Sequence, residues 1–189
     1  IVMRVALIGG TGFVGGYLID ALLEAGHDVS LLVRRGSEGK VQADVWRKIS
    51  GDTADDSAVA ATVAECNAVI YNVGILRESP GRGITFESLQ FDGAVRAVEA
   101  AKDAGARRFL LMSANGAKVP GTPYQETKKR AEDYVLSSGL DATVFRPSVI
   151  FGDPKGKMEI ATQLYRDVVR PPVPAPGFVT SAGHVRMSP

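Results

Sequence analysis

The chain has 189 residues, which domain-size statistics place at one compact domain with at most a small appendage. Hydrophobic residues make up 45% and charged residues 23% of it, so disordered, collagen-like and disulfide-scaffold proteins are excluded. The formal net charge is +1 and no run of like charge exceeds three residues, which argues against nucleic acid or an anionic membrane as a partner. The longest uncharged stretch, 5–19, is too short and too rich in glycine to insert into a bilayer. The single cysteine, Cys66, cannot form an internal disulfide, so we expect a reducing, cytoplasmic setting.

Short apolar runs alternate with longer segments of helical spacing along most of the chain. Helices are expected at 13–25, 57–65, 86–104 and 124–138, and left-handed helix caps at Gly26, Gly105 and Gly139. Strands are expected at 5–8, 29–33, 69–73, 109–112 and 142–145, the last continuing into 148–151, with a weaker strand within 45–49. Strands that are apolar on both faces and alternate with helices predict a parallel sheet covered on both sides. The expected fold is therefore a doubly wound α/β, Rossmann-type domain.

A proline-rich stretch at 170–177 reads as an extended connector, which implies a further unit. We expect a dinucleotide-binding domain over 3–154 and the start of a small, incomplete substrate lobe over 155–189. Whether a targeting peptide precedes the sequence stays open.

The first expected strand runs into the turn GGTGFVGG at 9–16 and then into the first helix. Glycines at these spacings allow a tight turn, close approach of the backbone to a diphosphate and close packing of helix on strand, while the helix N-terminus offers free N–H groups. The alternatives are a structural turn or another nucleotide ligand such as a methyl donor. The expected cofactor contacts in this turn are Gly9, Thr11, Gly12, Phe13, Val14 and Gly15.

Arg34 and Arg35 follow the second strand, where an NAD-selective site usually places a carboxylate. Guanidinium groups there can hold a 2′-phosphate, so NADP is favoured over NAD, the alternative being a solvated basic turn. Asp52, after the third strand, could accept a hydrogen bond from the adenine amino group, or it could be an ordinary loop aspartate.

Chemistry-bearing residues also follow the fourth and fifth strands. Val73 and Gly74 would let the backbone lie close beside a cofactor, and Ser113 puts a hydroxyl at the same sheet edge. Tyr124 and Lys128 lie four residues apart, on one face of the next helix. The Lys128 ammonium would favour the phenolate, so that Tyr124 could pass a proton while Ser113 holds a substrate carbonyl or hydroxyl.

The alternative is an amphipathic helix in which Tyr124 packs and Lys128 to Arg130 form the solvated side. His27 and His184 have no partner at metal-ligand spacing, so no metal site is expected. Cys66 is expected in the core rather than as a nucleophile.

The chain resembles the short-chain dehydrogenase/reductases of the extended or atypical kind. It is most similar to the branch that includes the nucleotide-binding accessory subunit of respiratory complex I and the epimerase/dehydratase-like proteins. The resemblance covers residues 3 to about 154 and rests on GGTGFVGG at 9–16, LLVRR at 31–35, GD at 51–52, VGILRE at 73–78, FLLMSANGA at 109–117, PYQETKKRAED at 123–133 and RPSVIFGDP at 146–154.

This resemblance implies a catalytic trio of Ser113, Tyr124 and Lys128. It also implies a nicotinamide carboxamide lined by Pro147, Ser148 and Val149. Gln90 stands where many members carry an asparagine, and relatives continue well past this length into a substrate lobe.

The expected function is that of an NADP-dependent oxidoreductase or epimerase/dehydratase-like enzyme, with NAD as the alternative cofactor and a small molecule as substrate. The alternative function is a non-catalytic module that holds NADPH as a structural subunit or a redox sensor. A homodimer or a larger redox assembly is the expected form.

Overall fold

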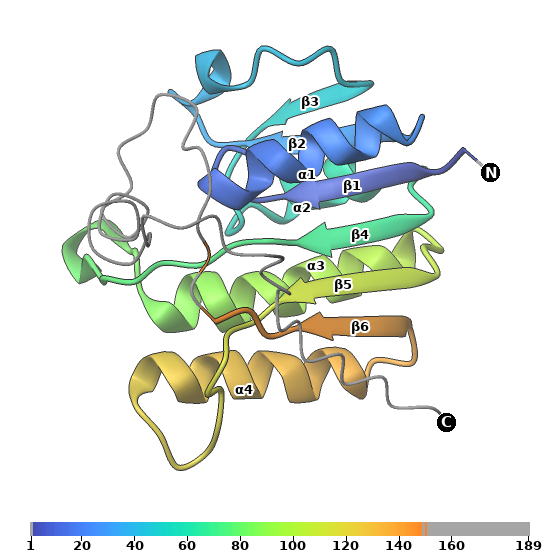
Figure 1. Ribbon diagram of the computed structural model, residues 1–189. Coiled ribbons are helices and arrows are strands. Elements are labelled where there is room, and N and C mark those ends of the chain that lie inside the picture. The colour runs from blue at the N-terminus through green and yellow to red at the C-terminus, as the bar shows by residue number, and fades with distance from the viewer. Residues whose placement is uncertain (1, 149, 151–189) are drawn as a thin grey trace, which may run out of the picture.

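The structure, a computed structural model, describes residues 2–148 and 150. Six parallel strands form one sheet in the order β3-β2-β1-β4-β5-β6, and all their arrowheads point the same way in Figure 1. This order is that of a Rossmann fold and confirms the doubly wound α/β prediction. The strands are β1 (Arg4–Ile8), β2 (Asp28–Val33), β3 (Arg47–Ser50), β4 (Ala68–Tyr71), β5 (Arg108–Met112) and β6 (Asp141–Phe145).

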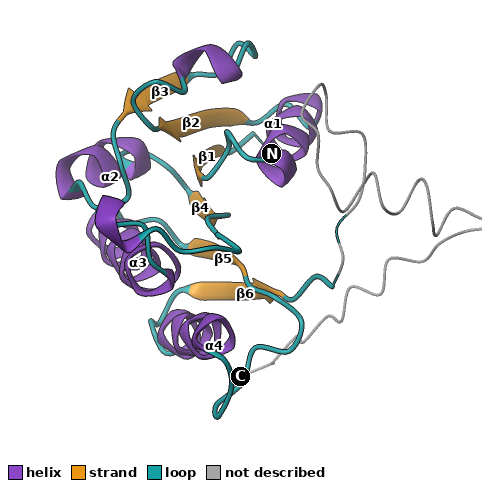
Figure 2. Ribbon diagram, turned by 90° about the vertical axis from the view of Figure 1, so that its left-hand side faces the viewer, coloured by secondary structure: helices purple, strands orange, loops and turns teal. Residues whose placement is uncertain are grey.

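Helices cover both faces of the sheet. Helix α1 lies alone on one face, and α2, α3 and α4 lie on the other (Figure 2). Each face of the sheet has its own hydrophobic core, and alternate residues of β1 contribute to the two. Leu7 packs on the α1 side and Ile8 on the α2–α3 side. The helices are α1 (Phe13–Glu24), α2 (Asp56–Val63), α3 (Gly93–Asp103) and α4 (Pro123–Leu136), with short 3₁₀ turns η1 (Glu38–Lys40) and η2 (Pro80–Arg82) and a π-helix η3 (Glu87–Asp92).

The helix expected at 86–104 is two elements, the π-helix η3 and then α3. Tyr71, fully buried at the end of β4, donates a hydrogen bond to the carbonyl of Leu89 within η3 (2.5 Å). A Cβ at Gly93 would lie 2.1 Å from the Tyr71 hydroxyl, so only glycine lets α3 begin this close to the tyrosine. The helical backbone continues from η3 into α3, and Tyr71 lies where the π-helical pattern gives way to the α-helical one, which periodicity does not reveal.

The edge strands also differ from expectation. β3 begins within the expected range and extends one residue beyond it, to Ser50, and its charged side chains suit an edge: Arg47 reaches Glu65 and Lys48 reaches the Val41 carbonyl. β6 ends at Phe145 and does not continue into 148, because Pro147 lacks an N–H and its carbonyl accepts instead from Asn115.

The three expected helix caps are confirmed, with positive φ at Gly26, Gly105 and Gly139. Cys66 is buried in the core, as expected. The predicted lobe at 155–189 and its connector lie outside the described residues. No helix in the described part of the chain is both long and apolar enough to cross a membrane.

Candidate cofactor and active site

The glycine turn lies where the strand order reverses, between β1 and β4. Gly9 has φ +100°, and a Cβ there would lie 2.5 Å from the carbonyl oxygen of Asn72, which follows β4. The Asn72 side chain donates to the Gly9 carbonyl (3.2 Å) and ties the two strand ends together. In doubly wound folds this reversal is where ligands bind.

Gly12 and Gly15 have different structural roles around this turn. A Cβ on Gly15 would lie 2.4 Å from the Gly9 carbonyl oxygen, so the glycine lets α1 pack directly on the turn. Gly12 caps α1 in extended conformation and is exposed, and a Cβ there would meet only the Gly9 carbonyl oxygen, at 3.6 Å. The helix has no acidic residue in its first turn, and its N-cap residue Gly12 has no side chain to cap it. Its positive end therefore begins at an exposed glycine, which suits an anionic group such as a diphosphate. Thr11 lies in this turn and Phe13 and Val14 begin α1; their contacts with a cofactor stay a prediction.

Arg34 and Arg35 are both exposed just beyond β2. The Asp55 carboxylate has a lowered pKa because of hydrogen bonds from Ser57 and Ala58, with a smaller effect of the Arg35 charge. Glu38, the first carboxylate after the two arginines, accepts a hydrogen bond from Ser50 at the end of β3. Both guanidinium groups thus lie beyond the carboxyl end of β2, and their contact with a 2′-phosphate stays a prediction.

Asp52 is exposed in the loop after β3. One of its carboxylate oxygens, Oδ1, accepts from the Ala54 amide (3.2 Å) and the Thr53 hydroxyl (3.3 Å). It shapes a local turn, and its contact with adenine stays a prediction.

Lys128 is buried, only 4% exposed. Its Nζ donates to the carbonyl of Met112 (2.9 Å), the last residue of β5, and to that of Val73 (3.3 Å), which lies just beyond β4. A Cβ on Gly74 would lie 3.4 Å from that Nζ, so the ammonium lies against an exposed glycine at the sheet edge. Burial lowers the pKa of Lys128 to about 8. The expectation that Lys128 lies on a solvated helix face is wrong, although Arg130 two residues on is exposed.

Tyr124 lies one turn before Lys128, in the first turn of α4. Thr122 and Gln125 form a capping box there and Pro123 occupies the first helical position, which fixes where the helix begins. The half-buried ring packs edge-on against Phe86 (5.5 Å between centroids), and burial raises the Tyr124 pKa. Lowering of that pKa by Lys128 stays a prediction for the cofactor-bound chain.

Ser113 is buried directly after β5, and its hydroxyl has a partner other than Tyr124. Its Oγ donates to Oε1 of Glu132 on α4 (2.5 Å). Glu132 is itself 1% exposed and forms a bidentate ion pair with Arg146, which follows β6. Among the described residues, no hydrogen bond joins the side chains of Ser113, Tyr124 and Lys128.

The structure describes two of the three residues expected to line the nicotinamide carboxamide. The Pro147 carbonyl accepts from the Asn115 amide and Ser148 is exposed, whereas Val149 lies outside the described residues.

Sequence reasoning assigned no role to three buried or half-buried polar groups near this edge: Gln90, Glu132 and Arg146. A signal for Glu132 was available, because it continues the row formed by Tyr124 and Lys128 at four-residue spacing. Arg146 gave no such signal, since its partner is set by the packing of α4 on β6.

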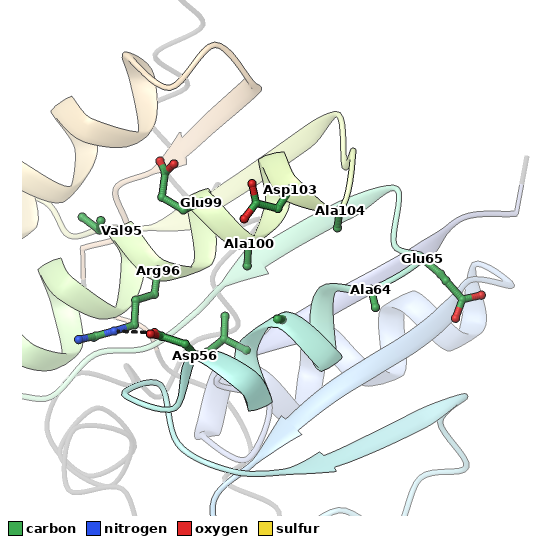
Figure 3. Close-up of a pocket in the computed structure, with 11 residues that line it drawn as sticks. Asp56, Ala64, Glu65, Val95, Arg96, Glu99, Ala100, Asp103 and Ala104 are labelled. Carbon is green, nitrogen blue, oxygen red and sulfur yellow. Dashed lines mark ion pairs between the residues drawn. The ribbon is translucent and has the colours of Figure 1, made fainter.

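A pocket lies between α2 and α3 (Figure 3). Ala60 and Ala100 are among the residues that line it, and Asp56 and Arg96 form an ion pair there (3.1 Å). This pocket contains none of the predicted site residues. No group of three or more metal-ligating side chains occurs in the described chain. His27 accepts a hydrogen bond from the Met3 amide, and His184 lies outside the described residues.

Known proteins resemble the chain over this same region. The ceramide reductase of Caulobacter vibrioides is 33% identical over 150 residues, 78% of this chain and 46% of that protein. Subunit 9 of the mitochondrial NADH dehydrogenase alpha subcomplex of Arabidopsis thaliana is 32% identical over 155 residues, 77% of this chain and 38% of that protein. The chain thus spans about half the length, or less, of these relatives.

The solved structure of WbmH from Bordetella bronchiseptica, in complex with NAD⁺, matches the fold with a TM-score of 0.71 at 20% identity. The match covers 84% of this chain and 60% of that one. The model of a family described as NAD(P)H-binding matches residues 9–170. The glycine turn at the strand reversal and these similarities agree, and the chain belongs to this NAD(P)H-binding family, among the extended short-chain dehydrogenase/reductase-like proteins.

Proposed function

We propose that the chain is the cofactor-binding part of an NADP-dependent oxidoreductase that acts on a carbonyl or a secondary alcohol. The observation that carries the proposal is the burial of Lys128, whose ammonium joins the ends of β4 and β5 beside Gly74. A buried ammonium is costly, so its retention at the sheet edge where a dinucleotide would lie favours a functional role.

NADPH bound at this edge would supply a hydride to the substrate carbon. Tyr124 would give its hydroxyl proton to the substrate oxygen, so that a carbonyl becomes an alcohol and the oxidised cofactor leaves. Burial keeps the phenol protonated at neutral pH, which suits this direction. Lys128 has a third N–H beyond the two that bind carbonyls, and it could hold the nicotinamide ribose.

Preference for NADP rests on Arg34 and Arg35. Both are exposed at the end of β2, and no carboxylate lies within 29–35 to repel a 2′-phosphate. A guanidinium group can bind that phosphate in bidentate fashion.

The test is oxidation of NADPH with a panel of aldehydes, cyclic ketones, long-chain lipid ketones and nucleotide sugars. Tyr124→Phe should lower turnover by roughly 10²-fold or more while NADPH affinity changes little. Tyr134→Phe is the matched control, because Tyr134 lies on the same helix but donates to Glu99 on the exposed side. Equal turnover by the parent and Tyr124→Phe would refute the role of the phenol.

A non-catalytic cofactor-holding subunit is the second candidate. The Ser113 hydroxyl favours it, because that hydrogen goes to buried Glu132 rather than toward Tyr124. The similarity to a subunit of NADH dehydrogenase points the same way. Tight NADPH binding without turnover of any panel substrate would support this candidate.

A further inference from the structure

We propose that Glu132 is a positioning residue of the nicotinamide side, which fixes the Ser113 hydroxyl and holds Lys128 as a charged ammonium. Its effect on turnover rests on the proposed function, but its effect on Lys128 can be measured without cofactor or substrate. Glu132 lies on α4 one turn beyond Lys128 and two turns beyond Tyr124, so all three share one side of the helix.

Both carboxylate oxygens of Glu132 are engaged. Oε1 accepts from Ser113 Oγ (2.5 Å) and Arg146 Nε (2.8 Å), while Oε2 pairs with Arg146 Nη2. Ser113 follows β5 and Arg146 follows β6, so one buried carboxylate joins α4 to the ends of two strands. A side chain held at so many points has a fixed position and can fix its neighbours.

Lys128 needs a nearby negative charge, because its hydrogen-bond acceptors are neutral backbone carbonyls. The ends of β4 and β5 offer it no charged side chain within the described residues. η3, which packs on α4, carries the uncharged Gln90 and two carboxylates, Glu87 and Asp92. Glu87 pairs with Arg130 on the exposed side, and the charge of Asp92 acts on Tyr71. Along α4, Tyr124 and Glu132 lie one turn to either side of Lys128, and Arg146 is paired with Glu132.

The charge of Glu132 works against the cost of burial. Burial lowers the pKa of Lys128 to about 8, and the Glu132 carboxylate acts in the opposite direction. The Arg146 guanidinium is paired with that carboxylate. Without the charge on Glu132, Lys128 would lose its proton closer to neutral pH.

The same carboxylate determines what Ser113 can offer. A hydroxyl has one hydrogen, and that of Ser113 goes to Glu132. Toward the crevice its oxygen then presents lone pairs only. It can accept a hydrogen bond from a substrate alcohol or from Tyr124, but it cannot donate one to a carbonyl.

The test is the titration of Lys128 in the cofactor-free full chain, followed through the ¹³Cε resonance of labelled lysine and assigned by its absence in Lys128→Met. In Glu132→Gln the Lys128 pKa should fall by about one unit, a tenfold change in proton affinity. Asp133→Asn is the matched control, because Asp133 lies on the same helix but pairs with Lys129 at the surface. It should leave the Lys128 titration unchanged.

Loss of a buried charge partner can prevent folding, so Glu132→Gln/Arg146→Gln is the second variant. It removes both charges of the pair, and the Lys128 pKa should still fall but by less than in Glu132→Gln, because loss of the Arg146 charge acts in the opposite direction. An unchanged Lys128 titration in whichever variant folds would overturn the proposal. Absence of turnover in the parent chain would defeat the proposed enzyme function and leave this result standing.

Discussion

The glycine turn after β1 and the buried charges around Lys128 are built by different means. At the glycine turn, backbone conformation shapes the surface: Gly9 and Gly15 allow a close approach that no side chain permits. At the ends of β4 and β5, buried charged side chains shape it: Lys128 and Glu132 are held by strand ends and by Arg146. The first kind of site depends on local sequence, whereas the second depends on tertiary packing and on the balance between burial and charge.

The largest expected effect is on the glycine turn. Gly9→Ala places a Cβ 2.5 Å from the Asn72 carbonyl oxygen at a positive φ, and it should destabilise the fold by about 3 kcal/mol. Gly16→Ala is the matched control, because no atom lies within 4 Å of the added Cβ and alanine favours a helix. Chemical denaturation measures both. Equal stability of the two variants would contradict the close approach in the turn.

Lys128 should give stability an unusual dependence on pH. Its pKa is about 8 when folded and about 10.4 when unfolded, so between these values the unfolded chain binds more protons. The cost of burying the charge is therefore fully present below pH 8 and is relieved as the pH rises toward 10.4.

The measurement is the free energy of unfolding of the parent minus that of Lys128→Met, from pH 7 to 10. This difference should move in favour of the parent by roughly 2 kcal/mol as the pH rises. A flat difference would mean that Lys128 titrates normally and is not buried as a charge.

Loss of the Ser113 hydroxyl tests how much its hydrogen bond to the buried Glu132 carboxylate contributes to stability. Ser113→Ala removes a donor to a carboxylate that is 1% exposed, and it should cost about 1 to 2 kcal/mol of stability. The control is Ser57→Ala, whose hydroxyl donates to exposed Asp55 and should contribute less than about 0.5 kcal/mol. Similar costs for both would show that burial of the Glu132 cluster is not what makes its hydrogen bonds matter.

The smallest expected effect is on cofactor preference at the adenosine side. Arg34→Ala should weaken NADPH binding about tenfold, or roughly 1.4 kcal/mol, and leave NADH binding nearly unchanged. Arg107→Ala removes the same charge at the opposite sheet edge and serves as control. Isothermal titration with both cofactors decides the matter, and equal weakening for NADPH and NADH would remove the 2′-phosphate assignment.

The same contrast explains how far the sequence alone could be interpreted. The order of strands and helices, the glycine turn and the caps at Gly26, Gly105 and Gly139 follow from local patterns, and the structure has them. The split at η3 does not follow from local patterns, because Tyr71 lies on a strand some 20 residues earlier in the sequence. Lys128 shows the limit most clearly: among three consecutive basic residues, only packing of α4 decides which one is buried.

The pairing of Glu132 with Arg146 lies beyond sequence reasoning for a related reason. The two residues meet only because α4 packs beside β6. The charge pattern of the helix alone does not indicate which of its carboxylates is buried. The position of Ser113 after β5 was expected, but the partner of its hydroxyl depends on that same packing.

The central claim is that one dinucleotide lies across the crevice, from the glycine turn to Lys128. A ¹⁵N–¹H NMR titration of the full chain with NADPH tests it most directly. The account predicts that the amides of Gly12 and Val14 and those of Gly74 and Lys128 shift together with one Kd, while Ala60 and Ala100 in the α2–α3 pocket do not respond. Shifts confined to the pocket, or to one end of the crevice alone, would contradict it.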